Sequence, residues 1–431
     1  MALSNSAKRY IKDKLYLQKR RIRKIVMAAP FWVLLTGVAL TSLGIGRYAF
    51  LTDNRQDQNM ASYWEYNAQL NYRHMSVYGR GARPGGETTP PVYINTSSSL
   101  KRSDIVTIRT TLQGLADTSL GQSSSGKGGL NSDGRPRGWE DCYSSFLTGT
   151  IESIAANDST TQFTFTSTSD IIAVDGNFPA FHPFRYMSGG FLPEVAYDNR
   201  QIVLNDVLAW KFYKSYDVIG NTVRLWGEEF TIIGVVDEPN DRISRSAGTE
   251  QPRAYIYFSA MEELAPLEAV DLSAAGSQGS NGNSSALAST ASAPAGTGAA
   301  GAADPASGTG TTTQRPDMAI LCYEAMLPEA VRNVAKNDMS SAITNYNPAD
   351  PNFYIISNTG RFSLLNSFHF MWPIGKTESR LAAYEFPYWE KTAQLTSEHL
   401  FADEVVTVAG FVTLVSGAIM AALRYRKSSR K

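Results

Sequence analysis

The sequence predicts an α+β domain on the outer side of a membrane, placed between two transmembrane helices. Two long uncharged runs lie toward the ends of the 431-residue chain, and each has a basic flank on its terminal side. A short strand, a short helix and a hairpin follow one another between residues 201 and 239. Further predicted strands and helices surround this unit along the chain, so both kinds of element belong to one domain.

Charge is distributed unevenly, although the totals balance at 40 basic and 40 acidic residues. Residues 1–24 contain nine Lys or Arg and one Asp, and residues 424–431 contain five Lys or Arg and no acid. The part between them has 26 basic and 39 acidic residues, a formal net charge of −13. Both ends are therefore basic, while the acidic middle gives no reason to expect a nucleic-acid partner.

The two uncharged runs are the predicted transmembrane helices. Residues 25–46 contain no charged side chain, and their helix would be about 33 Å long, enough for the ~30 Å hydrocarbon core. Residues 405–423 are the second run, rich in Gly, Ala and Ser. The basic flanks predict that both termini are cytoplasmic, which places the chain in the cell membrane with the large domain outside. The alternatives are a cleaved signal peptide for the first run and a buried core helix for the second.

The segment after the first predicted span begins with polar and loop-forming residues. Residues 60–72 favour an amphipathic helix leading away from the bilayer, and residues 79–91 favour a loop because they are rich in Gly and Pro. Ser103-Asp104 then begins a helix with an apolar face. That face consists of Ile105, Ile108, Leu112 and Leu115.

Strands are predicted next. Residues 146–154 and 162–166 alternate apolar with polar side chains around Asn157-Asp158, which favours a hairpin. Residues 171–174 predict a further short strand, and residues 181–193 a loop.

Residues 201–239 contain the most detailed pattern. The apolar run at residues 202–204 predicts a strand, and Asn205 is suited to cap a helix over residues 206–212. Gly220-Asn221 ends that pattern. The hairpin that follows has predicted strands at residues 222–225 and 230–236.

This order of elements resembles the extracytoplasmic core domain of MacB-type permeases, the FtsX-like branch of ABC transporters. The family's unit reads strand, short helix, D-x-I-G-x-T-V, strand and F-T-I-I-G-V, which corresponds here to residues 202–236. The segment SDIVTIRTTL, which begins at Ser103, is similar to the helix that begins the family's core domain. The motif positions, for which the resemblance implies a structural role, are Asp217, Ile219, Gly220, Thr222, Val223, Phe230, Gly234 and Val235.

The resemblance covers roughly residues 103–356 and implies a MacB-like periplasmic core fold. Two positions depart from the family pattern. Gly189-Gly190 stands where the family has Gly-Arg, and Tyr257-Phe258 lacks the family's proline.

Residues 271–315 interrupt the predicted domain. They are almost wholly Ala, Gly, Ser, Thr and Pro, and so little apolar surface cannot offset the conformational entropy of ordering. We therefore expect a disordered linker. Outside the unit and the linker, the later predicted elements are strands at 255–258, 318–325 and 353–356, and helices at 328–339, 362–372 and 380–400.

The predicted division of the chain follows from these elements. It comprises a basic cytoplasmic segment (1–24), a first span (25–46), a membrane-proximal part (47–102), the first part of the core (103–270), the linker (271–315), the second part of the core with return helices (316–400), a second span (405–423) and a basic tail (424–431).

The two cysteines, Cys142 and Cys322, both fall in the predicted outside part. An oxidising compartment permits a disulfide between them, and two buried free thiols are equally compatible with the sequence.

No catalytic, cofactor-binding or metal-binding constellation is predicted. The four histidines, His74, His182, His369 and His399, are scattered and lack metal-ligand spacing. Gly121, Gly126 and Lys127 have the spacing of a phosphate-binding loop. However, Gly128 stands where a Ser or Thr is needed and no apolar strand precedes it, so residues 121–137 are expected to be a loop.

The resemblance implies a non-catalytic, permease-like subunit of an ABC-type transport or transenvelope machine, not an enzyme. Family permeases have four transmembrane helices, whereas this chain has two predicted. A cytoplasmic ABC ATPase and either a multi-span permease or further copies of the chain are therefore the expected partners, together with membrane lipid at the basic N-terminal segment. The alternative is a membrane-tethered extracellular binding or sensor protein without a transport partner.

Overall fold

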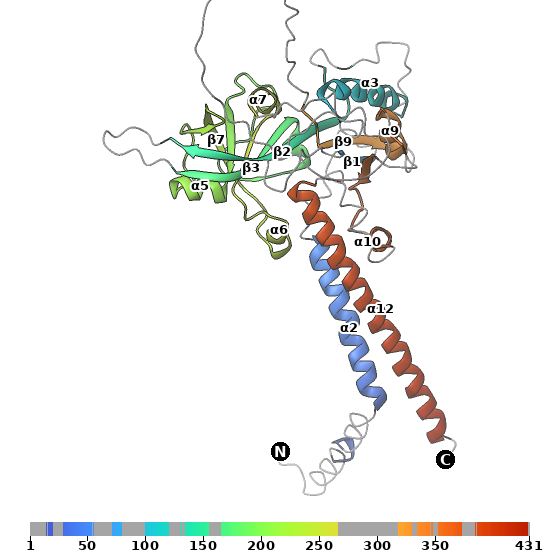
Figure 1. Cartoon of the computed structure of the whole chain (residues 1–431). Helices are drawn as coiled ribbons and strands as arrows, with labels where there is room; N and C mark the ends of the chain where they lie inside the picture. Colours follow the sequence, from blue (N-terminus) through green and yellow to red (C-terminus); the bar gives the residue numbers. More distant parts are fainter. Residues whose placement is uncertain are drawn as a thin grey trace, which may run out of the picture.

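The computed structural model describes the two long helices and most of the domain that they carry (Figure 1). The described residues are 14, 16–19, 29–53, 55, 71–79, 100–119, 130, 134–154, 165–265, 318–329, 334–344, 346–347, 352–372, 384 and 386–429. The expected linker at residues 271–315 lies outside them, as do most of the loops expected at 79–91 and 121–137 and most of the helix expected at 60–72.

One ten-stranded sheet forms the centre of the domain. Its main path runs β10-β1-β9-β2-β3-β8-β5-β7-β4, and β6 pairs with both β2 and β7. The strands are β1 (Asn71–Gly79), β2 (Glu140–Ser153), β3 (Thr166–Gly176), β4 (Arg185–Gly189), β5 (Gln201–Asn205), β6 (Thr222–Leu225), β7 (Glu228–Asp237), β8 (Arg253–Tyr257), β9 (Cys322–Glu329) and β10 (Phe353–Ser357).

Strand β2 joins the two halves of this sheet. Its first residues pair with β9, its centre pairs with β3, and its last three residues pair with β6. Because β6 also pairs with β7, the strands β2, β3, β8, β5, β7 and β6 close into a ring. The strands β9, β1 and β10 extend the sheet on the other side of β2.

Short helices cover the sheet. Helix α3 (Arg102–Ser119) lies next to α9 (Val334–Ala342) over the β9-β1 side (Figure 1). The buried positions Ile105, Ile108 and Leu112 confirm the predicted apolar face of α3. The other helices of the domain are α4 (Phe178–Phe181), α5 (Asp206–Tyr213), α6 (Arg242–Ser246), α7 (Phe258–Leu264) and α10 (Leu364–Met371).

The unit predicted at residues 201–239 is present as β5, α5, β6 and β7. Asn205 caps α5, since its side-chain oxygen accepts a hydrogen bond from the Leu208 N–H at 3.0 Å. Gly220 has a φ of +84°, which explains why the chain needs glycine there.

Glycines on β4 and β7 allow these two strands to lie very close together. Strand β4 approaches β7 so closely that a Cβ on Gly234 would lie 1.9 Å from the Gly190 carbonyl oxygen. Gly189 itself has a φ of +65°. This close approach therefore depends on glycine on both strands.

Several predicted elements were wrong in extent or type. Residues 71–79 form strand β1, which pairs with β9 and β10, although the expected helix ran to residue 72. Pro328 lies inside β9 opposite Tyr72, and the helix expected to begin there begins at Val334. Proline is compatible with that position because it stands at the end of the ladder.

Strand β4 was also missed, inside the expected loop at 181–193. The strand expected at 171–174 is part of the longer strand β3, which begins at Thr166, while most of the strand expected at 162–166 lies outside the described residues. The helix expected at 380–400 begins only at Tyr388, and it continues without a break through the second predicted span.

Two long helices carry the domain. Helix α2 (Ala29–Asp53) and helix α12 (Tyr388–Ser429) are both long and apolar enough to cross a membrane. They lie side by side, and the chain termini are at their far ends (Figure 1). Gly37, Gly44, Gly410 and Gly417 lie in the contact, and a Cβ on any of them would come within 3.0 Å of the opposite helix.

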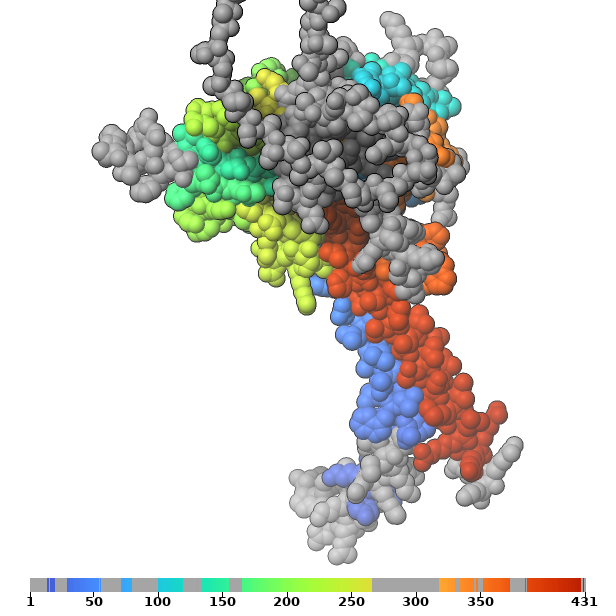
Figure 2. Space-filling model, in the orientation of Figure 1, coloured from blue at the N-terminus to red at the C-terminus, as the bar shows by residue number. Residues whose placement is uncertain are grey.

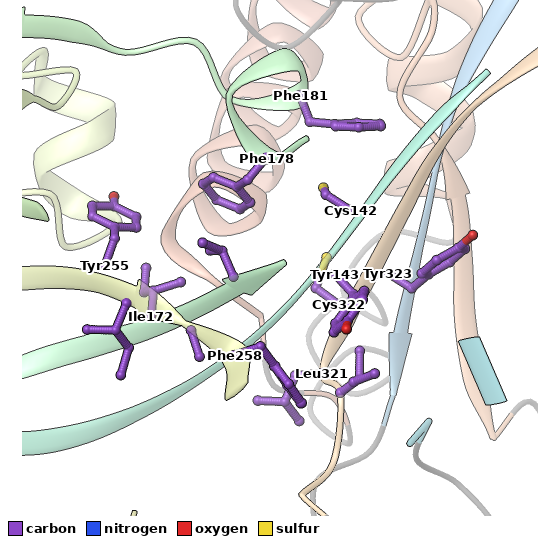
Figure 3. Close-up of a cluster of buried hydrophobic side chains, with 14 of the residues drawn as sticks. Cys142, Tyr143, Ile172, Phe178, Phe181, Tyr255, Phe258, Leu321, Cys322 and Tyr323 are labelled. Carbon is purple, nitrogen blue, oxygen red and sulfur yellow. The ribbon is translucent and has the colours of Figure 1, made fainter. Parts of the chain in front are cut away.

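The core contains both cysteines (Figure 3). Cys142 and Cys322 are buried free thiols, which is the second of the two alternatives that the sequence leaves open. They lie on the neighbouring strands β2 and β9, but Cys142 is opposite Glu324 and Cys322 is opposite Ser144. Burial, followed by the Glu324 carboxylate, raises the pKa of the Cys142 thiol well above its usual value. The disulfide that the sequence permits between them is not formed in this structure.

Candidate functional site

Buried charged side chains gather where the first turn of α12 meets the sheet. Glu238, Arg253, Glu324, Arg361 and Glu390 are all buried. They come from five different parts of the chain, at or next to β7, β8, β9, β10 and α12. We call this region the α12 junction. Burying a charge without a partner costs free energy, so the partners of these side chains show what holds the region together.

Glu390, in the first turn of α12, is held by side chains from the domain. Both terminal nitrogens of Arg361 donate to its carboxylate, at 2.6 and 2.8 Å. The O–H of Tyr78, on β1, donates to Glu390 Oε2 at 3.2 Å. Burial lowers the pKa of Arg361, but the Glu390 carboxylate outweighs it and the pKa is raised. The first turn of α12 is thus fixed to β1 and to the segment after β10.

Tyr388, the first residue of α12, connects the helix to β8. Its hydroxyl lies 3.0 Å from the hydroxyl of Tyr255, and the Arg253 guanidinium lies 4.1 Å from the centroid of its ring. Arg253 pairs with Glu238, which also accepts a hydrogen bond from the Tyr255 hydroxyl at 2.6 Å. Burial raises the pKa of Glu238, and the pairing with Arg253 only partly offsets this.

Glu324, on β9, lies between two histidines. Its Oε1 is 3.0 Å from His74 Nε2 and its Oε2 is 2.5 Å from His182 Nε2. The hydroxyl of Ser76 also donates to Oε1 at 2.7 Å. Burial alone would raise the pKa of Glu324, but the two histidines outweigh it and hold the pKa well below its usual range. The ring of His182 in turn packs against Trp389 of α12, with centroids 4.5 Å apart.

The outer end of α2 is fastened beside the same region. Arg55 is buried, and it donates to Ser244 Oγ at 3.0 Å and to Asp241 Oδ2 at 2.6 Å. Asp241 also caps helix α6. Burial raises the pKa of Asp241, but the hydrogen bond from Ser244 and the Arg55 charge outweigh it and lower the pKa. Both long helices are therefore tied to the domain by ionic contacts, of which the one at Glu390 is fully buried and the one at Asp241 is partly exposed.

A small hollow lies among these groups. Its free volume is about 50 Å³, and Arg55, His74, Glu324, Arg361 and Trp389 are among its lining residues. That volume has room for a few water molecules but not for an organic substrate. Within the described part of the chain, no cluster of His, Cys, Asp and Glu could hold a metal ion. The site is an arrangement of paired charges and stacked rings that fixes helices to a sheet.

The sequence did not indicate that His74 and His182 meet. They come from β1 and from the end of α4 and share Glu324, whereas His369 lies on α10 and His399 on α12. The run FHPF at residues 181–184 signals burial of His182. Contacts between strands that are hundreds of residues apart leave no local pattern, so the rest of the cluster could not be found.

The family-motif residues lie mostly away from the junction, in the ring of strands. Asp217, Ile219 and Gly220 are exposed, and Thr222 is half-buried. The buried motif residues are Val223 on β6 and Phe230, Gly234 and Val235 on β7. Strand β7 leads directly to Glu238, so this unit is continuous with the junction.

Residues 95–303 match the model of the MacB-like periplasmic core domain. No curated protein sequence matches the chain. Solved structures that are similar to the chain include the following two. One is the periplasmic region of MacB from Actinobacillus actinomycetemcomitans, with 14% identity, a TM-score of 0.34, and coverage of 66% of this chain and 88% of that one.

The other is the extracellular domain of the noncanonic ABC-type transporter YknZ from Gram-positive bacteria. It has 9% identity, a TM-score of 0.32, and coverage of 66% of this chain and 99% of that one. At TM-scores this low, these two structures add no support to the match with the family model. The predicted fold class is confirmed: a mixed α/β domain lies between two helices that can span a membrane. The chain is a membrane protein with an extracytoplasmic domain, and residues 95–303 of it match the MacB-like periplasmic core domain.

Proposed function

We propose that this chain is a non-catalytic, permease-like subunit of an ABC-type transport or transenvelope machine. In this proposal it couples a partner ATPase in the cytoplasm to movement of the domain outside. The observation that carries the proposal is α12, one helix of 42 residues whose first turn is clamped in the domain and whose last turn is basic. At ~1.5 Å per residue it is about 63 Å long, so a displacement at one end reaches the other without a joint.

The proposed partners are a cytoplasmic ABC ATPase and either a multi-span permease or further copies of this chain. The outward faces of the helix pair are suited to contact a partner or lipid inside the membrane. They present exposed apolar side chains, namely Trp32, Leu35, Val38 and Leu43 on α2 and Val408, Phe411, Val412 and Val415 on α12. Basic residues at the two ends are proposed to lie in the cytoplasm, where the ATPase acts.

Affinity purification of the tagged full chain from gently solubilised membranes tests this proposal. We expect an ABC ATPase and a polytopic permease, or a higher oligomer of the chain with the ATPase, to copurify. Replacing residues 405–423 with an unrelated apolar span should abolish the association, because it removes the specific contact surface but keeps the anchor. Recovery of the chain alone would contradict the proposal and would favour a tethered binding protein.

A further inference from the structure

Helix α10 presents an apolar surface toward the outside of the protein. Leu364, Leu365, Phe368 and Trp372 are all exposed, and 83% of Leu365 is accessible. Leu364, Phe368 and Trp372 follow one another at intervals of four residues and so share one face of the helix. From residue 362 to residue 375 the chain contains no Asp, Glu, Lys or Arg. This surface is defined here as the α10 face.

The opposite side of α10 is fixed to the domain, so the helix cannot turn this face inward. Ser367 is fully buried, and its hydroxyl donates to the Ser363 carbonyl at 3.1 Å. Phe370 packs against the core, with its ring centroid 5.6 Å from the buried guanidinium of Arg361. Asn366 donates to the Gly360 carbonyl at 2.8 Å.

Two contacts place α10 at the level where the membrane spans end. The hydroxyl of Tyr48 donates to the carbonyl of Phe362 at 2.6 Å, and Tyr48 directly follows Arg47, the first charge after the uncharged run of α2. The ring of Phe368 lies 6.0 Å from that of Phe401, shortly before the uncharged run of α12 begins at residue 405. Figure 2 shows the orange segment that contains α10 beside the upper part of the helix pair.

We propose that α10 is an interfacial helix whose apolar face lies in the outer headgroup region of the bilayer. The α10 face is continuous with the membrane-spanning surface, because Phe368 packs on α12 at the end of the span. Leu, Phe and Trp are the residues with which surface helices enter that region, and the aromatic ones favour the interface itself. The α10 face is therefore covered by lipid, and this contact sets the tilt of the domain relative to the membrane.

Site-specific fluorescent labelling of the full chain in liposomes tests this proposal. The polarity-sensitive probe NBD is attached to Leu365→Cys, which is selective because the native cysteines are buried. Tyr197→Cys, where 97% of the side chain is exposed, is the matched site in water, and Val412→Cys is the matched site inside the span. The liposomes are phosphatidylcholine with bromine atoms either near the headgroup or near the chain ends.

At position 365 we expect blue-shifted emission and loss of intensity with the shallow bromines, and a smaller loss with the deep ones. Interfacial helices enter only about 5–10 Å below the headgroups, which explains this order. At position 412 the order should reverse, and at position 197 neither lipid should quench. Emission at 365 like that at 197 would overturn the proposal. Blue-shifted emission that no lipid quenches would also overturn it, since that result identifies a protein partner.

Discussion

The charged residues at the α12 junction matter for stability mainly because each one is the partner of another buried charge. Glu390 and Arg361 are both almost fully buried, with side-chain exposures of 2% and 5%, and neither charge is solvated if the other is lost. A buried ion pair is weak evidence of net stability, but breaking one from a single side is costly. The junction therefore offers a direct test by substitution.

Glu390→Gln should destabilise the domain strongly. The amide keeps the size of the side chain but leaves the Arg361 charge buried without a counter-charge, a loss of roughly 3–5 kcal/mol. Chemical denaturation of the purified protein in mild detergent measures the change. Glu250→Gln is the control, since Glu250 is 62% exposed and pairs with Arg245 at 3.6 Å, a contact worth at most about 1 kcal/mol. Equal effects of the two variants would contradict the role assigned to Glu390.

Stability should also fall in acid because of Glu324. The histidines hold its pKa below the ordinary value of 4.5, so its contribution is present above that pH and is lost as the pH falls toward the lower value of the folded state. Denaturation midpoints recorded from about pH 6 to pH 3 should decline less steeply for Glu324→Gln than for the wild type. Glu250→Gln should keep the wild-type slope. Parallel curves for wild type and Glu324→Gln would show that Glu324 is not linked to folding.

At the same scale, sequence reasoning worked where the cause is local. The cap at Asn205 and the end of the pattern at Gly220 follow from neighbouring residues, and both were predicted. The pairing of His74 with Glu324 joins residues 250 positions apart, and it depends on which strands become neighbours. No pattern around either residue carries that information.

At the scale of elements, the contact between α2 and α12 is unusually close. A Cβ on Gly410 would lie 2.6 Å from the backbone nitrogen of Thr41, and one on Gly44 would lie 2.1 Å from Thr407 Oγ1. Backbone atoms cannot move aside as a flexible side chain can. Small residues therefore set the spacing of this helix pair.

Gly410→Ala should separate the two helices and destabilise the protein by roughly 1–3 kcal/mol, the usual cost of overpacking. Gly46→Ala is the matched control, because nothing lies within 4 Å of its Cβ position. In a helix that control should be neutral or gain up to about 1 kcal/mol. Thermal unfolding in mild detergent compares them, and equal melting temperatures would show that the helices are not in contact there.

Helices and strands were predicted well where their apolar residues recur at a regular period. They were predicted poorly where the pairing of distant strands determines the structure. The apolar face of α3 and the alternating strand β6 have clear periods, and both were found. Strand β1 was missed because its residues are buried on both faces between β9 and β10, so its sequence does not alternate. Pro328 suggested a helix start, although its position at the end of β9 suits a strand equally.

At the scale of the whole molecule, the arrangement across the membrane is the central expectation. Segregated charge and two uncharged runs predicted it, and the two long helices that the structure describes agree with that prediction. The number and identity of the partners depend on surfaces outside this chain.

Both ends of the chain should be inaccessible from outside the cell. A membrane-impermeant maleimide should label Tyr197→Cys on intact cells, because that side chain is exposed on the domain. Leu17→Cys and Tyr425→Cys, also at exposed positions, should react only after the membrane is permeabilised. The wild-type protein gives the background, since both native cysteines are buried. Labelling of either terminal site on intact cells would refute the proposed orientation.

The position of β1 has a consequence for the order of events during synthesis. This strand emerges early, yet both of its neighbours, β9 and β10, belong to the last third of the chain. Contacts so distant in sequence form slowly and only once both partners are available. In the nascent domain β1 therefore stays unpaired until β9, which ends at Glu329, has been translocated, and its other edge stays open until β10 follows. The last contact to form, between Glu390 in the first turn of α12 and Arg361, coincides with insertion of α12 into the membrane.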